Sequence, residues 1–170
     1  IFLSANGVSS IFSNFEDSYH VDFSRNFFKQ YLLSIGVSVV LAFLSLVTVI
    51  MFFYFEFYIL NNLGSLIPSE IRLTRIGQFT FFGLFIYLTV NILYYFGTIE
   101  GSKNQFFTIG ALMTTLLFFL TTYGFGIYIE NFSNYNQLYG SIGALLIFLL
   151  YIWMNSNILL LGFELNATLT

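Results

Sequence analysis

The sequence has no cysteine, one proline (Pro68) and one histidine (His20) in 170 residues, and only 8% of its residues are charged, against roughly 25% in an ordinary soluble domain. Without cysteine, this chain forms no disulfide and no thiolate metal site. A zinc hydrolase ordinarily needs two or three converging nitrogen ligands, which a single imidazole does not supply. No glycine-rich nucleotide motif or pair of heme ligands is present either, so we expect no metal and no cofactor.

Positive charge is equally scarce. The formal net charge is -3, and the five Lys and Arg residues are scattered over three regions without forming a basic run. Binding to a phosphate backbone requires a basic patch or groove. We therefore expect no nucleic-acid partner.

Hydrophobic residues, in contrast, make up 58% of the chain. Charge-free stretches cover residues 30–55, 76–99, 104–129 and 131–163, and each exceeds the roughly 20 residues that cross a bilayer core. They predict four membrane spans at about 32–55, 76–96, 106–128 and 139–162. The turns between spans are short, so neighbouring helices should be antiparallel. The predicted fold is an all-α, polytopic transmembrane bundle.

The remaining segments are shorter. Residues 1–31 read as the end of a preceding membrane helix followed by an interfacial segment, and 32–170 as the bundle. The connector Glu56–Arg75, which contains Pro68, predicts a turn with short interfacial helices. The chain begins without Met, so we interpret it as a piece of a longer protein. Three basic residues against two place Lys103 and both chain ends in the cytoplasm, by a small margin.

Polar residues recur at helical spacing on the predicted spans. On the first span, Ser34, Ser38, Ser45 and Thr48 form one line that Gln30 extends. On the second span, Tyr87, Asn91 and Tyr94 share a face. Two interpretations stay open for such stripes: hydrogen bonds between helices, or the lining of a cavity. The Tyr87, Asn91 and Tyr94 set is the best candidate for a cavity, because two phenols and an amide exceed the needs of one helix contact.

The fourth span is polar on two sides. Trp153, Asn157 and Glu164 fall on one face, and Asn155, Gly162 and Asn166 fall on nearly the opposite face. This pattern predicts a central helix with neighbours on both sides, approaching closely at Gly140 and Ala144. Asn157 and Glu164 join the candidate cavity or ion site. Glu164 has two interpretations: a structural acceptor or partner of Lys103, or a proton or cation site at a cavity mouth.

Three stretches carry a resemblance to a known family. They are "LYYFG" (93–97), "YIENFSNYNQLYGSIGALLIFLLYIWMNSNILLLGFELNATL" (128–169), and "NGVSSIFSNFEDSYHV" leading to "SRNFFKQ" (6–30). The chain resembles the YihY/BrkB family of bacterial inner-membrane proteins over essentially its whole length. The family-motif positions are Tyr135, Asn136, Tyr139, Gly140, Ser141, Gly143, Glu164, Asn166 and Ala167.

The resemblance implies a protein of about six spans with cytoplasmic ends, of which these residues would hold the last four. It also implies a proline before Gly110, where this chain has Ile109; we expect a straighter start to the third span as a result. The family often carries the label ribonuclease BN. One His, two Asp and no basic groove argue against nuclease activity here.

These observations favour a permease that moves a lipid or a small solute across the bacterial inner membrane, with membrane lipids as partners. The alternative is a non-transporting membrane scaffold for envelope partners. An intramembrane enzyme is the weakest hypothesis, because no His or Lys stands at helical spacing to activate a serine. The sequence leaves the oligomeric state open.

Overall fold

The computed structural model describes the backbone of residues 1–18, 26–63, 70–97, 106–132 and 136–169, and the side chains of 1–17, 26–58, 76–97, 106–130 and 143–169. All regular structure in these residues is helical. The helices are α1 (Phe2–Ser18), α2 (Phe27–Leu63), α3 (Glu70–Gly97), α4 (Ile109–Phe132) and α5 (Asn136–Leu169). The prediction of an all-α fold is confirmed.

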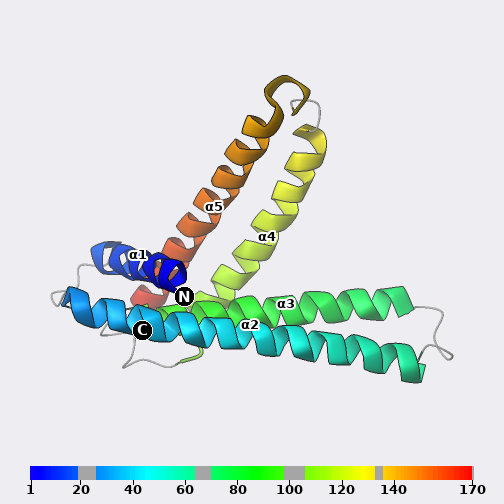
Figure 1. The fold of residues 1–170 in the computed structure, drawn as a ribbon, viewed down its shortest axis with the longest axis horizontal. Helices are drawn as coiled ribbons and strands as arrows, with labels where there is room; N and C mark the ends of the chain where they lie inside the picture. The colour runs from blue at the N-terminus through cyan, green and yellow to red at the C-terminus, as the bar shows by residue number, and fades with distance from the viewer. Residues whose placement is uncertain (19–25, 64–69, 98–105, 133–135, 170) are drawn as a thin grey trace.

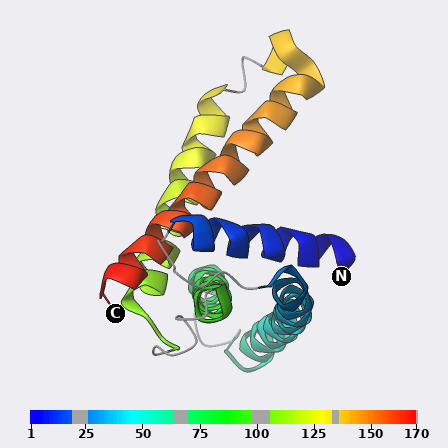
Figure 2. The same ribbon diagram turned by 90° about the vertical axis from the view of Figure 1, so that its left-hand side faces the viewer.

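The helices form two hairpins arranged as a V (Figure 1). α2 and α3 lie side by side in one arm, and α4 and α5 form the other arm. α1 packs across the end at which the arms meet, where it contacts α2, α3 and α5 (Figure 2). The two arms diverge away from this end, so the far ends of the hairpins lie well apart.

Buried side chains are concentrated at the closed end of the V, which we call the vertex. The vertex comprises α1, residues 30–38 of α2, 90–97 of α3, 108–115 of α4 and 159–166 of α5. Beyond these segments, Gly77 under the ring of Phe55 is the one buried residue that the structure describes. The packed core therefore joins the two hairpins at one end only.

Four helices are long and apolar enough to cross a bilayer, as the sequence predicts. The candidate spans are Phe27–Tyr58, Ile76–Gly97, Ile109–Glu130 and Gly143–Leu169. At most 28% of the most apolar stretch of each span is buried inside the structure. Such extensive apolar exposure is stable in lipid, where hydrocarbon surrounds the helices, and would be unstable in water.

The prediction for the connector between the first two spans is wrong. The connector Glu56–Arg75 was expected to hold a turn with short interfacial helices, but α2 continues to Leu63 and α3 begins at Glu70; residues 64–69 lie outside the described residues. At about 1.5 Å per residue, the 37-residue α2 is about 55 Å long. It exceeds the roughly 30 Å hydrocarbon core, so it tilts strongly or projects from the membrane.

The fourth predicted span is central only at its last turns, where it contacts α4, α1 and Tyr94 of α3. The face of α5 that carries Trp153 and Asn157 is exposed, as is Ala144, and the surroundings of Gly140 lie outside the described residues. The close approach of α5 to its neighbour occurs instead near its other end, at Gly162. Small residues occur at both ends of α5, and the spacing pattern alone did not distinguish between them.

Candidate functional site at the vertex

A buried hydrogen-bond cluster at the vertex links both hairpins. The Tyr94 hydroxyl on α3 donates to the carbonyl oxygen of Leu159 on α5 (2.8 Å) and lies 2.7 Å from Thr114 Oγ1 on α4. Thr114 Oγ1 is also 2.8 Å from the Gly110 carbonyl of its own helix. Tyr94 is 2% exposed and Thr114 is fully buried, so these bonds form away from bulk solvent, where they are least easily exchanged.

Two glycines permit this cluster. A Cβ atom on Gly162 of α5 would overlap Thr114 Oγ1 and would lie 2.5 Å from the Tyr94 hydroxyl. A Cβ atom on Gly110 of α4 would lie 2.5 Å from Asn166 Cβ and 2.8 Å from the Gly162 carbonyl oxygen. The backbones of α4 and α5 thus approach each other closely because both positions lack side chains, as expected for helices that pack in lipid.

Three aromatic rings cover the cluster from the side of α1. Phe15 of α1 stacks on Phe163 of α5, with centroids 4.2 Å apart and planes inclined by 9°. The Tyr94 ring lies edge-on to both, at 5.7 Å from each. Gly97 makes room for Phe15, whose Cδ2 would lie 2.6 Å from a Cβ at that position. These contacts hold α1, α3 and α5 in one packed unit.

Asn91, one turn before Tyr94, anchors the beginning of α4. Its Nδ2 donates to the Tyr87 carbonyl (2.7 Å), and its Oδ1 accepts from the backbone N–H of Thr108 (3.1 Å). Thr108 is in turn the N-cap of α4, because its Oγ1 accepts from the N–H of Ala111 (3.3 Å). Asn91 is fully buried. The polar character of position 91 was visible in the sequence, but its backbone partner 17 residues away was not.

Ile109 is the first residue of α4, the N1 position at which proline is favoured and bends nothing. A proline here would lack only an N–H that the helix leaves unpaired in any case. The expected difference in straightness between Ile109 and a family proline therefore has no physical basis in this fold.

The side chains of Tyr87 and Asn157 are not part of the cluster, and Glu164 lies in the vertex segment of α5. The Tyr87 ring is half-buried and stacks on Phe107 at 6.1 Å. Asn157 is exposed and donates to the Trp153 carbonyl of its own helix (2.7 Å). Glu164 is half-buried near the end of α5; its predicted partner Lys103 lies outside the described residues. Asn91 and Tyr94 are thus near each other at the vertex, whereas Asn157 lies outside it.

The family-motif positions occupy the two ends of α5. Gly143 is half-buried, whereas Asn166 is buried at the vertex and Ala167 is half-buried beside it. Asn136, Tyr139, Gly140 and Ser141 belong to α5, but their side chains, and Tyr135 altogether, lie outside the described residues. Gly143 and Glu164 are 21 residues, or about 32 Å, apart along the helix. The motif therefore does not form one compact site.

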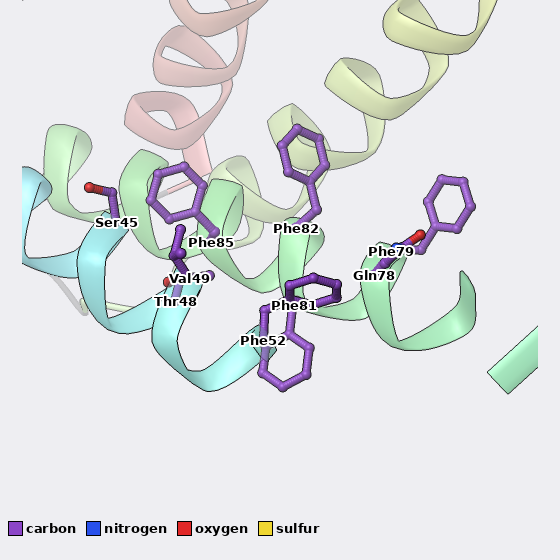
Figure 3. A pocket seen from close by; sticks show the side chains of 9 residues that line it. All are labelled: Ser45, Thr48, Val49, Phe52, Gln78, Phe79, Phe81, Phe82 and Phe85. Atoms are coloured by element: carbon purple, nitrogen blue, oxygen red, sulfur yellow. The ribbon is translucent and has the colours of Figure 1, made fainter. Parts of the chain in front are cut away.

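A groove on the α2–α3 hairpin, unnoticed in the sequence, provides a second candidate site. It has a volume of about 560 Å³. Its lining residues are Ser45, Thr48, Val49, Phe52, Gln78, Phe79, Phe81, Phe82 and Phe85. Figure 3 shows Ser45, Phe82 and Phe85 pointing to the side on which the other hairpin lies. None of the predicted site residues lines this groove.

The groove wall is effectively apolar despite its two hydroxyls. Ser45 Oγ donates to the Ala42 carbonyl (2.7 Å) and Thr48 Oγ1 to the Leu44 carbonyl (2.8 Å), so both protons are used within α2. Phenylalanine rings form most of the remaining wall. Such a surface favours hydrocarbon over an ion or a sugar.

Four apolar spans and a lipid-compatible surface define a multi-pass α-helical membrane protein. The family model described as virulence factor BrkB matches residues 1–170. The chain therefore belongs to the BrkB family, which confirms the resemblance in its sequence. Comparisons with curated proteins and with solved structures gave no match.

Proposed function

We propose that the protein is a permease of the bacterial inner membrane that moves a lipid or a small lipid-like solute. One observation carries the proposal. Among the described residues, the buried core joins the two hairpins at the vertex alone; beyond it the hairpins diverge and meet only through ring contacts, and an apolar groove of about 560 Å³ lies on the α2–α3 hairpin, on the side that faces the other hairpin. A groove lined with hydrocarbon-compatible surface suits the apolar part of an amphipathic substrate.

The groove favours lipid over other substrates. Its hydroxyl protons are bonded within α2, which leaves the amide of Gln78 as the one lining side chain with donors to offer. Gln78 is the third residue of the span that begins at Ile76. It therefore lies toward the membrane interface, where it suits the polar end of a lipid whose apolar part occupies the groove.

The vertex provides a pivot for alternating access. Beyond it, α3 meets α4 through ring contacts of Phe79 and Phe82 with Phe119, at 6.4 and 6.0 Å. In lipid, such apolar contacts are exchanged for hydrocarbon at little cost. Hydrocarbon cannot replace the hydrogen bonds at the vertex, because it offers no donor or acceptor. One hairpin can therefore rock against the other about the vertex, which is a recurrent mode of secondary transport.

The expectation that the protein is not an enzyme remains a prediction, as does its location in the inner membrane. Among the described residues, no three His, Asp or Glu side chains gather in one place. Transport is thus the function to test first, and a scaffold that transports nothing is the alternative outcome.

The test uses full-length protein in liposomes of phosphatidylethanolamine and phosphatidylglycerol that contain a fluorescent phospholipid. Lipid moved to the outer leaflet is quenched by a reductant that does not cross the bilayer. The matched variants are V49F, which projects into the groove, and I50F, which replaces the next residue on an exposed face outside it.

We expect V49F to slow lipid movement about tenfold, for an overpacking cost of about 1.4 kcal/mol, and I50F to leave it unchanged. Thermal unfolding of both variants controls for misfolding. If wild-type liposomes move lipid no faster than protein-free liposomes, the lipid-transport proposal fails and the scaffold is favoured. If both variants slow movement equally, the groove is not the path.

A further inference from the structure

Lys29 stands at the start of α2 without a counter-charge in the described residues. It lies in the first turn of the span Phe27–Tyr58, and this turn contains no acidic residue. Its side chain is exposed and forms no ion pair within the part of the chain that the structure describes. A lysine at the end of a span extends its ammonium group to the headgroup region of the bilayer.

A second groove, separate from that on the far part of the hairpin, begins at Lys29. It has a volume of about 470 Å³. Its other lining residues are Leu32, Leu33, Gly36, Val37 and Val40 of α2 and Phe96 of α3. Apart from the ammonium group, its lining side chains are hydrocarbon. The floor of the groove is open at Gly36, where a Cβ atom would meet nothing within 4 Å.

The length of the groove matches one leaflet. Lys29 and Val40 are 11 residues apart, which corresponds to about 16 Å along α2. Half of the roughly 30 Å hydrocarbon core is about 15 Å. With α2 along the membrane normal and its excess length projecting at the other end, the groove runs from the headgroup level, where the charge lies, to about the middle of the membrane, which is the distance that one acyl chain covers.

We infer that this groove binds one anionic phospholipid, with its phosphate on the Lys29 ammonium group and one acyl chain along Gly36 between α2 and Phe96. The charge favours an anionic over a zwitterionic lipid, since each lysine near the membrane surface attracts anionic lipid. The groove lies at the vertex, where the helices are packed together. The site therefore goes beyond the proposed transport and requires no movement of the hairpins.

The experiment is native mass spectrometry of the full-length protein, released from mixed micelles that contain equal amounts of phosphatidylglycerol and phosphatidylcholine. The variants are K29Q, which removes the charge, K29R, which keeps it, and G36L, which fills the groove. G126L is the matched control, because Gly126 is also an exposed helical glycine with nothing within 4 Å of a Cβ atom. Thermal unfolding verifies that each variant is folded.

We expect wild type, K29R and G126L to retain one phosphatidylglycerol in preference to phosphatidylcholine. K29Q should reduce that preference about fivefold, and folded G36L should reduce retention of phosphatidylglycerol by at least as much. Equal retention of both lipids by wild type, or unchanged preference in K29Q, would overturn the inference. If G36L does not fold, the comparison of K29Q with K29R decides it. Because lipid movement is not measured here, failure of this site leaves the transport test unaffected.

Discussion

The hydroxyls of Tyr94 and Thr114, 2.7 Å apart, have two protons for three hydrogen-bonding contacts. If Tyr94 donates to the Leu159 carbonyl, the Thr114 hydroxyl donates either to the Tyr94 hydroxyl or to the Gly110 carbonyl. If Tyr94 donates to Thr114 instead, the Leu159 contact has no proton. Tyr94 takes part in every arrangement that links α3 to the other hairpin, whereas Thr114 does not.

Y94F should therefore destabilise the protein more than T114V. Y94F removes both links between hairpins, and T114V leaves the bond from Tyr94 to Leu159 intact. Hydrogen bonds between membrane helices average about 0.6 kcal/mol and reach about 1.7 kcal/mol, so we expect a loss of about 1–2 kcal/mol in Y94F and less in T114V. Reversible unfolding of full-length protein in mixed micelles measures the difference. Y123F is the control, since Tyr123 is 75% exposed; an equal loss in Y123F would contradict the role of Tyr94.

A methyl group at Gly162 should be at least as harmful as loss of the Tyr94 hydroxyl. Its carbon would overlap Thr114 Oγ1, in a place where α4 and α5 are already in close contact. We expect G162A to cost about 1–3 kcal/mol, while G124A, with nothing within 4 Å of its new carbon, should be neutral or stabilising. The same unfolding measurement applies. T114A should recover part of the loss in the double variant, and simple additivity of the two changes would show that the overlap is not the cause.

Charge-free stretches predicted the four spans well, because burial of a charge in hydrocarbon is costly near the centre of a span. They did not predict that the two hairpins diverge as a V. In lipid, apolar burial does not drive helices together, so the angle between hairpins depends on a few close contacts. Tyr94 provides them here by reaching Leu159 and Thr114 where Gly162 leaves room, whereas the small-residue spacing of Gly140 and Ala144 pointed to the other end of α5. Periodicity showed that Asn91 and Tyr94 share a face. It did not show that Asn91 bonds the beginning of α4, or that Tyr94 bonds residues of α4 and α5.

N91L should loosen the beginning of α4 specifically. The substitution leaves the Thr108 N–H buried without its acceptor, at an expected cost of about 1–3 kcal/mol. Hydrogen exchange followed by mass spectrometry should show faster exchange in a peptide that covers the first turns of α4 than in one from the middle of α2. N157L is the matched control, because Asn157 is exposed and bonds only within α5. Uniform acceleration over all helices would indicate global destabilisation instead.

I109P should be tolerated, although a proline within a membrane helix is normally disruptive. Ile109 is the first residue of α4, where the fixed φ of proline suits the helix and the lost N–H has no helical acceptor. We expect a change in unfolding free energy within about 1 kcal/mol, because proline also restricts the unfolded chain and so offsets part of any loss. M113P is the control: Met113 is also an exposed residue of α4, but it lies one turn further on, where proline removes a helical hydrogen bond and costs about 3 kcal/mol. A loss in I109P as large as that in M113P would show that α4 begins before residue 109, and that Asn91 contacts the interior of the helix rather than its cap.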